Sequence, residues 1–179
     1  MAAGAAIDSL VNVLRTIPVG VIASERVVRS RPAGAGAIPA IAVFANDLEE
    51  RPAGIGAFVA QKRGPGNIPY EATGGREIGS LTAEIWTAGE EQGFPILQAA
   101  EIAIASAAAS QQGFLKLRVR SAGPATSEEL PDQSRAMRLS VVFSIVHEQV
   151  TGPPEDGGQV IQRVEVELTG ELSERMEIP

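Results

Sequence analysis

The chain has one histidine for acid–base chemistry, and a carboxylate follows it. His147 is the only histidine, and Glu148 comes directly after it. One imidazole excludes a pair of histidine metal ligands and leaves a single general base of this type. A serine hydrolase would need His147 with a serine and an acid, but the sequence contains no G-x-S-x-G stretch. We therefore interpret His147 as a surface histidine at the end of a strand. A small enzyme or ligand-binding domain that uses it with nearby acids stays as an alternative.

Two glycine-rich stretches have the spacing of phosphate-binding loops, and both lack the residues that the chemistry needs. GGREIGS, residues 74–80, has serine where a P-loop needs lysine, and a strand is expected after it instead of a helix. GAGAIP, residues 34–39, begins like a dinucleotide fingerprint, but Pro39 stands at the third glycine and no helix is expected next. We predict no nucleotide or other cofactor.

The acids Asp47, Glu49 and Glu50 could hold a divalent cation, but Arg51 beside them favours a solvated loop. The chain has no cysteine, which excludes disulfides, thiolate metal sites and thiol nucleophiles. We therefore predict neither a metal site nor catalytic residues.

The overall charge and hydropathy exclude two further classes of partner. The formal net charge is −7, whereas binding a phosphate backbone requires clustered lysine and arginine. No apolar run is long enough to predict a membrane span, and the first residues lack the basic region of a signal peptide.

Apolar residues at helical and strand spacings predict the elements that would position these groups. A helix is expected near the start and ends before Pro18, and its inward face consists of Ile7, Leu10, Val11, Leu14 and Ile17. Strands are predicted at 19–29 and 40–44, separated by a Pro/Gly loop. Residues 45–79 are rich in glycine and proline, so we predict a long loop there, within which 55–63 could form a hairpin arm.

The stretch EIWTAGEEQGF, residues 84–94, joins a strand to a helix. Alternation over 80–87 predicts a half-buried strand with Ile85 inward and Trp86 outward. Glu90 and Glu91 suit a helix N-terminus, and the helix is expected over 94–111 with Gly113 as its C-cap. Alanine on every face lets this helix lie close to a sheet or to another subunit.

Three more strands complete the chain. They are predicted at 114–120, with one basic face, at 136–146, and at 159–172. The order of elements predicts an α+β fold in which two main helices flank a mostly antiparallel sheet, within a single domain over residues 1–179.

The residues that carry a family resemblance run from about 5 to 148. They are the N-terminal amphipathic helix, the strand AIAVF, the long loop, the unit GSLTAEIWTAGEEQGFPILQAAEIAIASA, and the hairpin FLKLRVR…RAMRLSVVFSIVHEQ. In this order of elements, though not in an invariant motif, the chain resembles the phage tail terminator family.

The resemblance implies a structural virion protein that forms a ring, expected to be a hexamer, on the end of the tail tube. Such a ring ends tube growth and connects the tail to the neck. The implied partners are other copies of the chain, the tube protein, a neck or connector protein and, in a contractile tail, the sheath protein. DNA would pass through the channel without specific binding, and assembly would take place in the host cytoplasm.

Candidate interface residues follow from the same picture. They are Trp86, Glu84, Glu49, Glu50, Arg51, Phe58, Lys62 and Arg63. The alternative within the same kind of particle is another connector or tube component of a phage tail or a contractile injection system.

Overall fold

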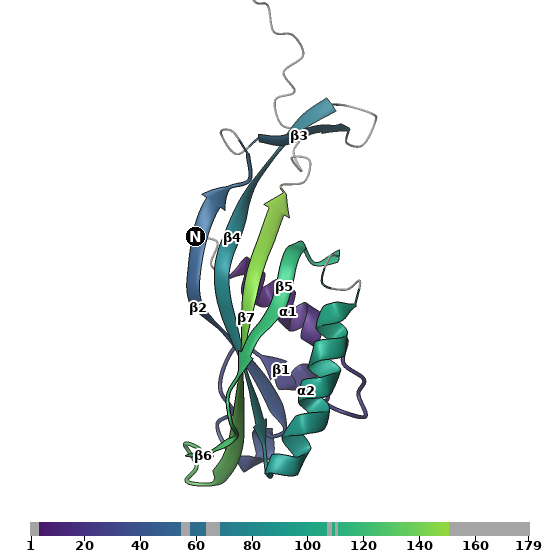
Figure 1. The fold of residues 1–179 in the computed structure, drawn as a ribbon. Helices are drawn as coiled ribbons and strands as arrows, with labels where there is room; N and C mark the ends of the chain where they lie inside the picture. Colours follow the sequence, from purple (N-terminus) through teal and green to yellow (C-terminus); the bar gives the residue numbers. More distant parts are fainter. Residues whose placement is uncertain (1–3, 55–57, 64–68, 107–108, 110, 151–179) are drawn as a thin grey trace, which may run out of the picture.

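The computed structural model describes residues 4–54, 58–63, 69–106, 109 and 111–150, in which two helices pack against one sheet (Figure 1). In chain order the elements are α1 (Ala5–Leu14), η1 (Ser24–Arg26), β1 (Val27–Val28), η2 (Ala35–Ala37), β2 (Ala40–Pro52), β3 (Phe58–Arg63), β4 (Pro69–Thr87), α2 (Glu90–Ala105), β5 (Phe114–Ala122), β6 (Thr126–Glu129) and β7 (Arg135–Val150). The predicted α+β class is confirmed.

The sheet is mostly antiparallel and has seven strands, in the order β1-β2-β4-β7-β5. Strand β3 pairs with β4 outside this path, and only the short β1–β2 pair is parallel. Strands β5 and β6 follow one another along the same edge of β7, opposite its residues 141–147 and 135–138. The edges of the body are therefore β2 with its short partner β1 on one side, and β5 with β6 on the other.

Both helices cover one face of the sheet, and the main core lies between them and the strands (Figure 1). Alternation along β7 turns Leu139, Val141, Phe143 and Ile145 toward the helices, and all four are buried. The helices contribute a matching apolar stripe, made of Leu10, Val13, Leu14, Ile96, Ala100 and Ile104. Burying one such large side chain contributes about 1.5–3 kcal/mol, so this layer supplies much of the driving force for folding.

A second, smaller core lies on the opposite face of the sheet, at the end where β4 finishes. It consists of Ala42, Trp86, Leu130 and Ala136, with Ile38 and Phe44 packed against it. Trp86 lies on the face opposite Ile85, as predicted, but it is only 3% exposed there. Alternation assigned Trp86 to the face opposite Ile85, but could not show that Leu130 and Ile38 cover that face.

Most of the predicted loop at 45–79 is strand. Strand β2 continues to Pro52, and β4 begins at Pro69 and runs for 19 residues. Two of the glycines and prolines show how such residues are accommodated: Pro52 ends a strand, and Gly79 pairs with Leu48, next to the irregularity between Ala45 and Asp47. The glycines and prolines indicated a loop, because the sequence did not show that distant strands pair with this segment.

Other boundaries also differ from the sequence prediction. Instead of a strand at 19–29, the structure has turns, η1 and the two-residue β1. Helix α2 begins at Glu90 and ends at Ala105 with Ser106 as its C-cap, so Gly113 is not the cap. Gly113 has φ 84° and leads into β5. The predicted strand at 159–172 lies outside the described residues, and no described helix is long and apolar enough to cross a membrane.

Gly79 should be intolerant of any side chain. Its φ is 155°, and an added Cβ would collide with the carbonyl oxygen of Asp47 on β2. We expect Gly79→Ala to destabilise the fold by roughly 2–4 kcal/mol, measured by urea unfolding. Gly20→Ala is the control, because an added Cβ there meets nothing within 4 Å. Equal midpoints for the two variants would contradict this account of the β2–β4 pairing.

Candidate functional site

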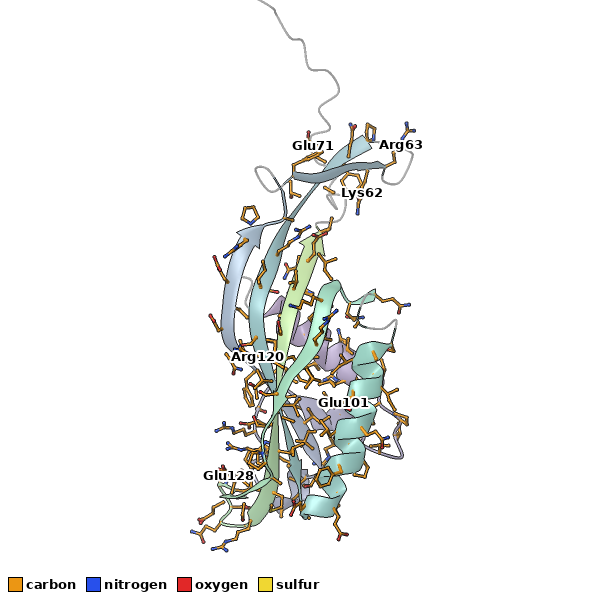
Figure 2. The ribbon with its side chains drawn as sticks, in the orientation of Figure 1. Lys62, Arg63, Glu71, Glu101, Arg120 and Glu128 are labelled. Atoms are coloured by element: carbon orange, nitrogen blue, oxygen red, sulfur yellow. The ribbon has the colours of Figure 1, made fainter. Side chains whose placement is uncertain are left out.

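Most of the predicted interface residues lie at one end of the molecule. Glu84 and Trp86 are the exceptions, because both are buried at the opposite end of β4. The others are exposed on β2 and β3, and they are Glu49, Glu50, Arg51, Phe58, Lys62 and Arg63. Figure 2 shows Lys62 and Arg63 at this end of the molecule. The structure therefore brings the six exposed residues together and places Glu84 and Trp86 away from them.

Strands β3 and β4 form an arm that extends beyond the body of the sheet (Figure 1). The part of β4 from Gly75 to Trp86 is paired on both sides, with β2 and β7. From Pro69 to Thr73, β3 is the only strand that pairs with β4 among the residues that the structure describes. Phe58 is 44% exposed on this arm, and Lys62 and Arg63 are exposed nearby. We define the arm as residues 58–63 and 69–73.

The exposed charges of β2 beside the arm do not form a metal site. The guanidinium of Arg51 donates to both carboxylate oxygens of Glu49, over 2.9 and 2.7 Å. These hydrogen bonds lower the pKa of Glu49 and raise that of Arg51. Both groups are solvent-exposed, so the pair stabilises the fold little. Within the described parts of the chain, no group of three or more His, Asp or Glu residues is placed to hold a metal ion.

The buried carboxylate of Glu84 contacts a network of charged and aromatic groups, in which Arg31 is exposed and Arg138 is partly buried. The guanidinium of Arg31 donates to both of its oxygens, over 2.8 and 2.7 Å, and the Trp86 indole donates over 3.2 Å. Arg138 lies 3.5 Å from the same carboxylate and forms a 2.9 Å ion pair with Glu128. Hydrogen bonding to Glu84 raises the pKa of Arg31. The network fixes the segment before β2 and the β6–β7 hairpin onto the sheet, which is a structural role.

The most suggestive chemical arrangement is on the helix side of the sheet. Nε2 of His147 lies 2.9 Å from the hydroxyl of Ser9 on α1, and Nδ1 lies 3.1 Å from Glu77 on β4. His147 is 3% exposed inside β7, so the predicted surface histidine at a strand end is wrong. Serine, imidazole and carboxylate follow one another in the order used by serine hydrolases.

Further contacts indicate that Ser9, His147 and Glu77 connect α1 to the sheet, and we call these three residues the clamp. Nε2 also lies 3.0 Å from the carbonyl oxygen of Gln112, which can only accept a hydrogen bond. Nδ1 likewise faces an acceptor, the Glu77 carboxylate. In the tautomer that carries its proton on Nε2 and donates to Gln112, Nε2 has no lone pair with which to activate Ser9. Glu77 accepts a 2.9 Å hydrogen bond from the backbone N–H of Ala6 and so holds the first turn of α1. The ring of Phe114 packs against the imidazole of His147, with 5.0 Å between the two ring centroids.

Ser9 and Glu77 were missed by the sequence analysis, although a signal for Glu77 exists. Counting back by twos from Leu81 along β4 places Glu77 on the inward face. The same count from Ile145 places His147 inward on β7, directly paired with Glu77. Ser9 had no comparable signal, because its contact with His147 depends on where α1 lies.

No family model and no curated protein matches the chain. Among solved structures it is similar to a chain of the "Virion of native gene transfer agent (GTA) particle", with 17% sequence identity and a TM-score of 0.40, over 83% of this chain and 98% of that one.

Removal of the Glu77 carboxylate from the clamp should strongly lower the free energy of unfolding. Glu77→Ala leaves the buried Ala6 N–H and the imidazole without their shared acceptor, and we expect a loss of about 3 kcal/mol in the free energy of unfolding. Glu71→Ala on the exposed arm of the same strand is the matched control, expected within about 0.5 kcal/mol of the parent. Equal urea midpoints would show that the clamp contributes nothing.

The same geometry predicts no Ser9-dependent hydrolysis. The parent chain and Ser9→Ala should hydrolyse p-nitrophenyl acetate at the same rate, because the Gln112 carbonyl shares Nε2 with the Ser9 hydroxyl and the imidazole is only 3% exposed to a substrate. His147→Ala measured beside them checks for any other imidazole contribution. A rate that falls with both substitutions would instead support the small-enzyme alternative.

Proposed function

We propose that this protein is a structural component of a phage-like tail, a terminator-type ring that caps the tail tube and connects it to the neck. The arm is the observation that carries the proposal. A two-stranded hairpin is at best marginally stable in water by itself, and this one continues β4 beyond the last residue that is paired on both sides. An arm of this kind is stabilised when it lies on a partner.

The surface of the arm suits such a contact. Phe58 presents an exposed aromatic ring, and the exposed charges of Lys62, Arg63 and Glu71 lie on the same arm (Figure 2). Aromatic and arginine side chains are the residues that most often dominate binding energy at protein interfaces. We assign the end of the tail tube as the partner of the arm, with copies of the chain supplying the ring.

The rest of the body also has the surface of an assembly subunit. Large apolar side chains remain exposed on α2 and β5 within the described chain, where Ile102 is 66% and Leu115 is 59% exposed. The alanine-rich sequence of α2 was expected to allow close approach by another subunit, and its outer side carries both Ile102 and the exposed Glu101 (Figure 2). The net charge of −7 would disfavour sticking of DNA that passes through the ring.

A connector or tube component of the same kind of particle would share these surfaces, and incubation with tube protein distinguishes it from a terminator. A terminator stops elongation when it is added in small amounts, because it binds only tube ends. A tube component would be incorporated along the length of the tube. Negative-stain imaging of tube lengths and of labelled protein separates the two.

Phe58 supplies the mutational test. In mass photometry the full chain should form closed rings of about six copies. Phe58→Ala should leave ring size and melting temperature unchanged but weaken tube-end capping by roughly 1–3 kcal/mol, seen as longer tubes at a fixed ratio of ring to tube protein. Phe94→Ala, which removes an exposed phenyl ring from the start of α2, is the matched control. Free elongation in the presence of the parent chain would contradict the terminator role.

A further inference from the structure

The body of the sheet has two long edges that carry no strand within the described residues. On one side, β1 covers only Ile41 and Ala42, so β2 from Val43 to Pro52 has an open edge. On the other side, β5 pairs with β7 alone. Figure 1 shows β2 and β5 at opposite sides of the sheet. An open edge presents unpaired backbone N–H and C=O groups, which is a template for pairing with another chain.

The directions of the two edge strands suit each other. The pairs β2–β4, β4–β7 and β7–β5 are all antiparallel, so β2 and β5 run in opposite directions. Rotation of a copy about an axis along the strands preserves these directions. The β5 edge of one copy therefore meets the β2 edge of the next as an antiparallel pair, and the same contact repeats around a ring.

The heights of the two edges also agree. We call a row of Cα partners that crosses the four strands β2, β4, β7 and β5 a rung. One rung consists of Glu49, Ile78, Val146 and Lys116. A second rung consists of Asp47, Ser80, Ser144 and Arg118. Between them lies a rung made of Leu48, Gly79, Ile145 and Leu117. A closed ring has no shift along its axis, so the two ends of each rung meet at the subunit boundary.

The residues that would meet are complementary on both faces of the sheet. On the face away from the helices, Lys116 would lie opposite Glu49 and Arg118 opposite Asp47, and all four are exposed. On the helix face, Leu117 would lie opposite Leu48, and both are half-buried. Opposite charges and apolar pairs directly across two strands are the contacts that stabilise sheets. A tilt of the strands would move the register in steps of two, which keeps charge facing charge.

The charges on the two edges are opposite in sign beyond these four residues. Strand β5 carries Lys116, Arg118 and Arg120 and no acid, whereas β2 carries Asp47, Glu49 and Glu50 with the single base Arg51. Within the chain, Glu49 is paired with Arg51 at an exposed site. Like-charged edges would repel, so two β5 edges or two β2 edges do not associate, and only the head-to-tail contact remains.

We propose that copies of this chain join head to tail by pairing β5 of one subunit with β2 of the next, with Lys116 against Glu49, Arg118 against Asp47 and Leu117 against Leu48, so that one sheet continues around the ring. This interface deepens the proposed ring function and rests on it. The other possible occupant of an edge is the chain's own residues 151–179, and that arrangement would leave the full chain monomeric.

Charge reversal tests the contact in both directions. Lys116→Glu with Arg118→Glu in the full chain should weaken ring formation by roughly a hundredfold in concentration, measured by mass photometry, and so should Asp47→Lys with Glu49→Lys. Each double variant puts like charges at both ends of the boundary. Mixing the two double variants should restore rings in which they alternate, and combining all four substitutions in one chain should restore rings of one kind.

Engineered cysteines test the register, because the chain has none of its own. Glu49→Cys with Lys116→Cys should give disulfide-linked ladders up to the full ring on oxidation. Within one chain these positions are separated by three strand spacings, about 14 Å, which no disulfide can span. Each single cysteine variant is the control and should stay unlinked.

The outcomes separate the two proposals. Rings that survive both charge reversals and give no ladder would overturn the β5–β2 interface and leave the ring function standing. A full chain that stays monomeric at every concentration, with or without tube protein, would overturn both. Double variants that assemble no better when mixed would overturn the assigned charge pairs even if ladders form.

Discussion

From Gly75 to Trp86, strand β4 is paired on both sides, with β2 and with β7, and the positions of the other elements depend on it. Its inward residues pack against α1 and α2, and its outward residues contact the segments that cover the opposite face. Its extension at one end becomes half of the arm. A central strand with both edges paired cannot slip without breaking two ladders, so its register fixes that of the whole sheet.

Two buried carboxylates on β4, Glu77 and Glu84, attach the remaining parts of the chain to that strand. Glu84 faces away from the helices and is neutralised by Arg31, with Arg138 close by, while Glu77 faces the helices and binds a backbone N–H of α1 and the imidazole of His147. Burying such groups costs desolvation free energy that the contacts offset only when the geometry is good. Their contribution is therefore largely to specificity, because a misplaced helix or loop would leave a buried charge without its partner.

The same sheet accounts for the outward-directed features. A body with open edges at β2 and β5, and an arm that continues beyond it, presents backbone groups, charge and an aromatic side chain, whereas the one imidazole that could act as a base is buried. Surfaces of this kind are suited to repeated contacts between copies and to one end-on contact with a different protein. The proposed ring and the proposed tube cap use different parts of the surface, which is why they can be tested separately.

The sequence by itself determined the local elements whose spacing is regular: the first helix, the strands around Ile85 and Phe143, the basic strand that begins at Phe114, and hence the α+β class. It could not determine residues 45–79, because glycine and proline indicate loops unless distant strands supply partners, as β7 and β2 do for β4. Nor could it place Ser9, Glu77 and His147 together or bury Trp86, since alternation assigns a side chain to a face and says nothing of what lies on it. The equal heights of the acidic residues on β2 and the basic residues on β5 were likewise decided by the tertiary structure, through the register of four strands that are far apart in the chain.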